Sequence, residues 1–211
     1  GVMAEHSKIE WTDATWNPGT GCSVVSPGCT NCYAMKLAGS RLKHHPSRAG
    51  LTRDTKAGPV WTGEVRLNED WLDQPLTWRK PKMIFVCAHG DLFHEGVHAA
   101  WIDRVFAAMA LANLMHHCRV EPGEPESHVF QVLTKRSARM RDYCEALPKR
   151  AALVASSIVD VNGERMPPPL IEAMVGLLET GPLPNVWLGV SVEDQTRADE
   201  RIPDLLATPA A

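Results

Sequence analysis

Three cysteines stand within eleven residues near the start of the chain. Cys22, Cys29 and Cys32 have the spacing C-x6-C-x2-C, in a stretch of Gly, Pro, Ser and Asn that is typical of a loop. Glycine lets the loop backbone turn without Cβ clashes, so the three thiolates can converge on one metal centre. In a chain with no sign of secretion, this clustering predicts a metal site rather than a disulfide framework.

Three ligands leave one coordination position open, and two kinds of metal centre are compatible with that. In an iron–sulfur cube the fourth iron would be free for an exogenous ligand, whereas zinc would take a fourth protein ligand or a water. Four histidines are candidates for a fourth ligand: His44, His45, His89 and His94. The other cysteines, Cys87, Cys118 and Cys144, are scattered, and we expect Cys87 and Cys144 to be packing residues or unused thiols.

Other residues that could do chemistry follow two predicted strands. His94 and Glu95 could form an acid/base pair, since histidine titrates near neutrality. A surface histidine without a catalytic role is the alternative. Lys135 stands at the carboxyl end of a strand, where α/β folds place their sites, although a solvated lysine is the simpler interpretation. His94, Glu95 and Lys135 are therefore the candidate catalytic residues.

The elements that must position these residues alternate between strand and helix. Strands are expected at 9–16, 83–87, 129–133 and 186–192, and helices at 33–42, 96–116, 137–146 and 193–206. This alternation predicts a parallel α/β sheet or barrel with right-handed crossovers. A closed barrel of eight units needs about 200 to 250 residues or more. With only four units counted, an open or truncated β/α barrel is the more economical prediction.

Length and composition indicate one globular domain, spanning 1–211. The chain has 211 residues, of which 44% are hydrophobic and 22% charged, so global disorder is excluded. Segments 39–71 and 151–184 interrupt the alternation as excursions, and the second is expected to contain one inserted helix. No stretch approaches the roughly 20 apolar residues of a membrane span, and no secretory signal is evident, so we expect a cytoplasmic protein without a membrane partner.

The net charge of −3 does not mark a nucleic-acid binder, but the charge is unevenly distributed. Segment 35–57 has Asp54 as its single acidic residue against six basic ones: Lys36, Arg41, Lys43, Arg48, Arg53 and Lys56. Segment 134–150 is also basic. Both could bind the phosphates of a nucleic acid or nucleotide. Solvated helix faces are the alternative, and the lack of interleaved aromatic residues speaks against stacking of single strands.

Over most of its length the chain resembles a family of phage-associated proteins with a three-cysteine motif, themselves similar to the radical S-adenosylmethionine (radical SAM) enzymes. The resemblance rests on IEWTDATWNP at 9–18, the cysteine loop running into Tyr33 and Ala34, DLFHE at 91–95, FQVLTKR at 130–136 and WLGVSVE at 187–193. It implies a [4Fe–4S] cluster held by Cys22, Cys29 and Cys32. It also implies that S-adenosylmethionine chelates the unique iron and is cleaved by one-electron reduction.

The resemblance also implies roles for residues at two strand ends. Gly90 and Asp91 occupy the position that meets the methionine amino group in radical SAM proteins, and an Asp that caps the next helical turn is the alternative. Ser191 and Glu193 could reach ribose hydroxyls or substrate, with helix capping again the alternative. All four residues are candidate cofactor-binding residues.

Two departures from the pattern accompany the resemblance. Radical SAM proteins usually have C-x3-C-x2-C, so the six-residue gap here requires a longer loop. Members of the family continue past a segment like 201–211 into further strands, which implies that C-terminal strands are missing here. We expect an iron–sulfur protein that performs a SAM-dependent radical reaction on a nucleic acid or nucleotide. The alternative is a zinc- or cluster-stabilised phage binding module without catalysis, acting on a host or phage protein partner.

Overall fold

A computed structural model describes residues 7, 9–117, 127–158, 160–161 and 164–210. At its centre lies a four-stranded parallel sheet in the order β1–β6–β7–β10. Its strands are β1 (Ala14–Trp16), β6 (Met83–Val86), β7 (Val129–Thr134) and β10 (Val186–Val190). The strands stand side by side in their chain order, so each crossover steps one place in the same direction.

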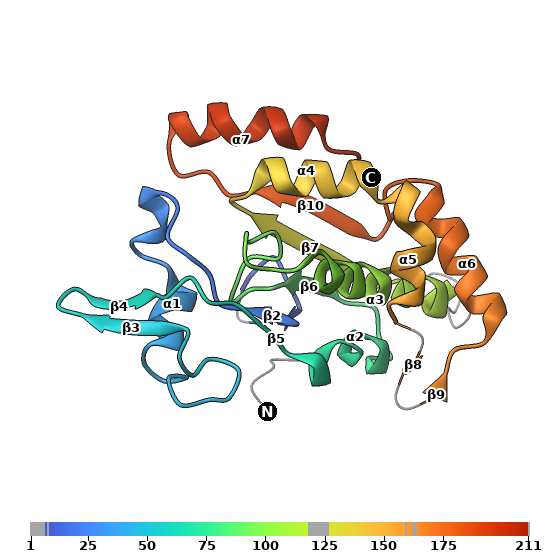
Figure 1. Cartoon of the computed structure of the whole chain (residues 1–211), viewed down its shortest axis with the longest axis horizontal. Helices are drawn as coiled ribbons and strands as arrows, with labels where there is room; N and C mark the ends of the chain where they lie inside the picture. Colours follow the sequence, from blue (N-terminus) through green and yellow to red (C-terminus); the bar gives the residue numbers. More distant parts are fainter. Residues whose placement is uncertain (1–6, 8, 118–126, 159, 162–163, 211) are drawn as a thin grey trace.

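This strand order determines where the helices lie. Right-handed crossovers that always step the same way place their helices on one side of a sheet. Four longer helices lie in these connections or after the last strand: α3 (Ala99–His117), α4 (Ser137–Ala146), α6 (Pro168–Glu179) and α7 (Gln195–Ala207). Figure 1 shows α4 and α7 side by side near the edge strand β10, and α3 packs against α6.

The two faces of the sheet differ in burial. Trp16, Ile84 and Phe130 are fully buried and belong to one hydrophobic core with α3 and α6. Side chains alternate along a strand, so their neighbours point to the opposite face. On that face Leu133 is 36% exposed and Trp187 is 52% exposed. We call it the open face and define it by residues Thr15, Phe85, Gln131, Leu133 and Trp187.

Beside the sheet, a smaller unit packs around its own hydrophobic cluster. It comprises α1 (Tyr33–Ala38) and the hairpin of β3 (Thr52–Thr55) and β4 (Gly58–Trp61). Met35, Leu51 and Trp61 form the centre of this cluster. We call residues 33–61 the hairpin lobe, and it projects from the body of the protein in Figure 1.

The remaining elements are short. They are β2 (Gly19–Thr20), η1 (Pro27–Cys29), β5 (Arg66–Leu67), η2 (Glu69–Trp71), α2 (Gln74–Thr77), η3 (Pro148–Arg150), α5 (Ala151–Ser156), β8 (Asp160–Val161) and β9 (Glu164–Arg165). No helix in the described ranges is long and apolar enough to cross a bilayer.

The predicted parallel α/β arrangement is confirmed, and the described strands form an open sheet rather than a closed barrel. Helix 137–146 has its predicted limits. Strand 9–16 is wrong in its first half, because residues 9–11 turn and pairing with β6 begins only at Ala14. The single helix predicted within 151–184 is also wrong: α5 and α6 both occur there, and α5 buries the small side chains Ala151 and Ala155. Cys118 lies outside the described residues.

Candidate functional site

Two glycines, Gly21 and Gly90, let the cysteine loop lie against the carboxyl end of β6. A side chain at either position would force neighbouring atoms to move. Gly21 has a φ of +92°, and an added Cβ would lie 2.2 Å from the Glu64 carbonyl oxygen. Its amide donates to the His89 carbonyl at 3.2 Å. At Gly90 an added Cβ would lie 3.1 Å from the Gly21 carbonyl oxygen. This close contact between two backbones brings Cys22 to the edge of the parallel sheet.

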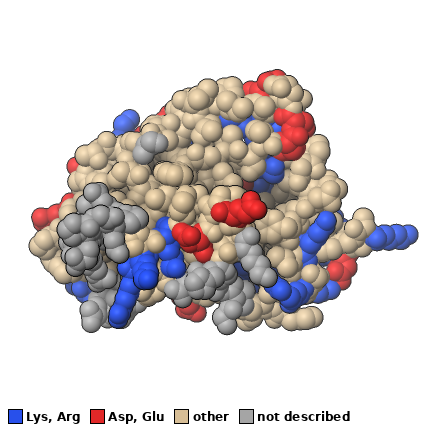
Figure 2. Space-filling view, turned by 180° about the vertical axis from the view of Figure 1, so that it is seen from behind, with Lys and Arg blue, Asp and Glu red and all other residues tan. Residues whose placement is uncertain are grey.

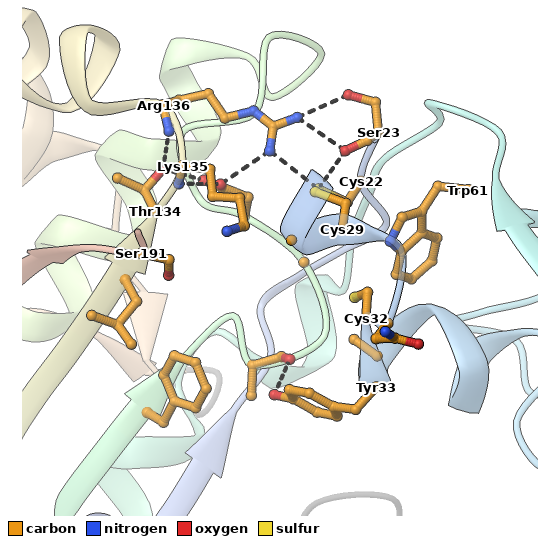
Figure 3. A pocket seen from close by; sticks show the side chains of 18 of the residues that line it. Cys22, Ser23, Cys29, Cys32, Tyr33, Trp61, Thr134, Lys135, Arg136 and Ser191 are labelled. Atoms are coloured by element: carbon orange, nitrogen blue, oxygen red, sulfur yellow. Dashed lines mark hydrogen bonds and ion pairs between the residues drawn. The ribbon is translucent and has the colours of Figure 1, made fainter. Parts of the chain in front are cut away.

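All three loop cysteines line one pocket of about 370 Å³ at this edge (Figure 3). The hairpin lobe contributes Tyr33 and Trp61 to the wall, and the open face contributes Phe85 and Leu133. The remaining lining residues are Trp11, Ala34 of α1, and residues of the cysteine loop and the strand ends: Ser23, Gly28, Asn31, Ala88, Gly90, Asp91, Thr134, Lys135, Arg136 and Ser191. The pocket therefore lies at the carboxyl ends of parallel strands, where α/β folds bind their ligands.

The three thiols differ in their electrostatic surroundings. All are free, and Cys29 is the most buried. Burial raises the pKa of Cys22 to about 11, although the Arg136 charge acts in the opposite direction. At Cys29 burial is outweighed by hydrogen bonds from the backbone amides of Val25 and Ser26, and the pKa is lowered. A thiol that coordinates a metal releases its proton to solvent, so a raised pKa does not prevent either sulfur from serving as a ligand.

The described structure holds no preformed site for a metal ion. Within the described residues, no three Cys, His, Asp or Glu side chains are grouped closely enough to hold one metal ion. Zinc requires all its ligands within about 2.0–2.3 Å of one point. The metal site expected at Cys22, Cys29 and Cys32 therefore remains a prediction from the sequence.

None of the four histidines proposed as fourth ligand lines the pocket. His45 contacts Ser47, with Nδ1 and the hydroxyl oxygen 2.7 Å apart. His89 Nδ1 accepts a hydrogen bond from the buried Arg48 at 2.6 Å, and burial together with that charge lowers the pKa of His89 to about 4. The lining of the described pocket therefore contains the three thiols and no histidine.

Arg136 is the residue that connects most parts of the site, and sequence reasoning missed it. Its side chain is 5% exposed and donates to Cys22 Sγ at 3.4 Å, Asp91 Oδ2 at 3.2 Å and Ser23 Oγ at 2.8 Å (Figure 3). It also donates to Glu95 Oε1 at 3.3 Å. Burial opposes its charge, but Cys22, Asp91 and Glu95 outweigh that and raise the pKa of Arg136. Its place directly after Thr134 and Lys135, at a strand's carboxyl end, was the available signal.

Asp91 lies in the pocket lining and is 7% exposed. Its carboxylate accepts hydrogen bonds from the Thr134 hydroxyl at 2.6 Å, the Lys135 amide at 3.1 Å and the Phe93 amide at 3.0 Å. With the Arg136 guanidinium, four donors hold it. Asp91 therefore ties the end of β6 to the end of β7, and Gly90 beside it faces the pocket.

Of the two other candidate cofactor-binding residues, Ser191 lines the pocket and Glu193 lies behind the cysteine loop. The Glu193 carboxylate accepts from Gly28 N at 3.3 Å, Lys135 Nζ at 2.9 Å and Arg201 Nη1 at 3.1 Å. Burial works against its ionisation, but hydrogen bonds from Ser26, Lys135 and Gly28 prevail and hold the pKa of Glu193 at about 2. Glu193 thus fastens the loop to the segment after β10.

This depressed pKa predicts a pH-dependent contribution to stability. Because the folded pKa of Glu193 lies below its ordinary value of 4.5, the interaction is fully present above pH 4.5 and is lost as pH falls toward 2. We expect wild-type protein to be more stable than Glu193→Gln near pH 6, with the difference shrinking between pH 4.5 and 2. Urea unfolding at a series of pH values measures it.

As a control, Glu179→Gln changes an exposed glutamate at the end of α6 and should leave the pH profile unchanged. A wild-type profile that runs parallel to the Glu193→Gln profile across this range would contradict the prediction.

The candidate catalytic residues are only partly brought together. His94 is 4% exposed, so a surface position is wrong. Its Nδ1 accepts from the Gly96 amide at 3.0 Å, which leaves Nε2 as the donor to Ser23 Oγ at 2.9 Å. Glu95 Oε2 is 3.7 Å from His94 Nε2, but neither side chain lines the cysteine pocket. Lys135 does line it, and its ammonium is paired with Glu193.

The other two described cysteines are buried, as expected of packing residues. Burial raises the pKa of Cys87 and of Cys144 to about 12, so both remain neutral thiols.

A parallel sheet with helices packed on it and a cysteine-lined pocket at its strand ends defines an α/β protein with a candidate metal centre. The chain belongs to the family described as "Protein of unknown function (DUF5131)", whose pattern matches residues 6–211. No curated protein and no solved structure matches it significantly.

Proposed function

We propose that the chain is an iron–sulfur protein of the radical SAM type, which acts on a nucleic acid or nucleotide. The observation that carries this proposal is the convergence of Cys22, Cys29 and Cys32 on one pocket whose lining includes no histidine. Three thiolates without a fourth protein ligand suit a [4Fe–4S] cluster with one iron left for S-adenosylmethionine. When bound, these groups supply one-electron reduction and radical chemistry.

The strand order supports the same class. In a β/α barrel successive parallel strands stand side by side in chain order, with all helices outside. The order β1–β6–β7–β10 has this property over four strands, whereas a doubly wound sheet reverses its order and is covered on both faces. A partial β/α barrel is therefore the architecture that we propose, with the open face as its inner surface.

The protein's own residues would bind and orient the reactants. Gly90 and Ser191 line the pocket and offer backbone and hydroxyl groups to S-adenosylmethionine. Arg136 holds Cys22 and Asp91 in fixed positions and places a positive charge beside a thiolate ligand. Trp61 and Tyr33 form the aromatic part of the pocket wall. His94 and Glu95 remain outside this arrangement, and Lys135 is the candidate proton donor at its rim.

Anaerobic reconstitution with iron and sulfide tests the proposal. We expect about four irons per chain in the wild type, and an EPR spectrum of the reduced protein that S-adenosylmethionine perturbs. The triple variant Cys22→Ala/Cys29→Ala/Cys32→Ala should lose the iron. Cys144→Ala is the matched control, because it removes a buried thiol outside the pocket and should retain all of it.

Binding of zinc alone, or iron that survives the triple substitution, would contradict the cluster. Stoichiometric zinc on the same cysteines would instead support the alternative, a metal-stabilised binding module that acts on a host or phage protein. That alternative and the cytoplasmic location both remain predictions from the sequence.

A further inference from the structure

A row of side chains crosses the open face over all four strands. Thr15 stands in register with Phe85, and Phe85 with Gln131. Gln131 in turn stands in register with Trp187. The ring of Trp11 packs on Phe85 with centroids 4.9 Å apart. Neighbouring strands in a sheet are about 4.8 Å apart. Phe85 and Trp187, on the two strands that flank Gln131, are therefore roughly 10 Å apart, with the Gln131 carboxamide between them.

The carboxamide at the centre of this row is incompletely satisfied. Gln131 is only 9% exposed, and it points to the open face because Phe130 and Val132 point into the core. Its Nε2 donates to the Trp11 carbonyl at 3.2 Å, but its buried Oε1 has no hydrogen-bond partner. An unpaired buried acceptor is unfavourable, so this oxygen suits a donor supplied by a ligand.

The row leads directly into the cysteine pocket. Trp11, Phe85 and Leu133 belong to the pocket lining, while Trp187 lies one strand further along the same surface and is 52% exposed. Figure 2 shows the side of the molecule turned away in Figure 1, with a broad area that carries few charges. A ligand lying across the open face would therefore pass from Trp187 to the thiols.

The hairpin lobe, which forms part of the pocket wall, carries an excess of positive charge. The hairpin lobe supplies Tyr33 and Trp61 to the pocket lining. Four of its basic residues are exposed: Lys36, Arg41, Arg53 and Lys56. Asp54 is the only acidic residue of the lobe and pairs with Lys43 at 2.6 Å. This surface is complementary to a polyanion that reaches the pocket.

We propose that the open face binds single-stranded nucleic acid. Unpaired bases stack on Trp187 and on the Trp11–Phe85 pair, a base N–H donates to Gln131 Oε1, and the phosphates lie along the hairpin lobe. A duplex hides its base faces and cannot make these contacts. This inference deepens the proposed function by naming its substrate class, but binding itself needs no metal.

Fluorescence anisotropy with a labelled 12-nucleotide single strand, as RNA and as DNA, tests it against the matching duplex. We expect at least ten-fold tighter binding of one or both single strands than of the duplex. Trp187→Ala should weaken binding at least five-fold. Gln131→Leu, which keeps the volume and removes the acceptor, should weaken binding of oligonucleotides. Leu206→Ala, an exposed apolar residue on α7, is the control and should bind as the wild type does.

The salt dependence tests the phosphate contacts. Lys56→Glu should weaken binding of all sequences and make the dependence on salt shallower, whereas Lys149→Glu, an exposed lysine in η3, should not. Equal binding of duplex and single strand, or unchanged binding by folded Trp187→Ala, would overturn the inference. If the iron-free triple cysteine variant binds single strands, the single-strand inference is supported even if the cluster proposal fails. If an iron-loaded protein binds no single strand, the single-strand inference is overturned and the cluster proposal stands.

Discussion

Arg136→Met is expected to destabilise the protein by about 3–5 kcal/mol, the usual cost of removing one partner from a buried ion pair. The side chains of Arg136 and Asp91 are 5% and 6% exposed, so water cannot replace the lost guanidinium. The three remaining donors to Asp91 are neutral. Urea unfolding measures the change, and for a chain of this size each kcal/mol corresponds to about 2–4 °C in melting temperature.

Two further variants show whether the buried pair is the cause. Arg141→Met removes a solvent-accessible arginine of α4 that pairs with Asp142 and Asp204, and we expect a much smaller loss because water screens these pairs. Asp91→Asn combined with Arg136→Met should cost less than the sum of the single changes, because the two residues interact directly. Additive losses would show that the pair contributes nothing beyond packing.

Gly21→Ala is the second change with a large expected effect, on both stability and iron content. The added methyl would overlap the Glu64 carbonyl oxygen, and the residue would have to keep a φ of +92°. A left-handed conformation costs about 1–2 kcal/mol for a non-glycine residue, and a forced backbone shift about 1–3 kcal/mol. Because Cys22 is the next residue, the shift would also displace a thiol, so reconstituted iron should fall well below the wild-type content.

Gly50→Ala is the control that separates the cost of a left-handed backbone from the cost of steric overlap with a neighbouring residue. Gly50 has a φ of +84°, but nothing lies within 4 Å of its added Cβ. This variant should lose only the conformational part, about 1–2 kcal/mol, and keep its iron. Equal losses of stability and equal iron contents in the two variants would show that the contact with Glu64 is unimportant.

The sequence predicted the parts of the fold that depend on local pattern. Helix 137–146 was predictable from its residues alone, and so were the buried strands at β6 and β7. The separation of α5 from α6 was not, because α5 is six residues long and owes its place to packing against α6 and α3. The turn at residues 9–11 looked like a strand because its bulky residues alternate with polar ones.

In the candidate site too, features that depend on local sequence were predictable, and features that depend on contacts between distant residues were not. The cysteine loop was visible because its three cysteines lie within eleven residues of one another. The Arg136 contact to Cys22 spans 114 residues, and the Glu193 contact to Gly28 spans 165, so no local spacing could indicate them. Gln131 looked like one polar residue in an apolar strand. Only the register of β6, β7 and β10 shows that it lies between Phe85 and Trp187.

The chain-order arrangement of the strands has a consequence for synthesis on the ribosome. The sheet can grow in the order in which its strands emerge, since β6 adds to β1, β7 to β6 and β10 to β7. Arg136 emerges 114 residues after Cys22. At about 5–20 residues per second, the nascent thiols stay without their guanidinium partner for roughly 6–23 s. If the proposed metal centre exists, metal that arrives during that interval would meet a loop not yet held by β7, so the site is expected to mature only after β7 and Arg136 have emerged.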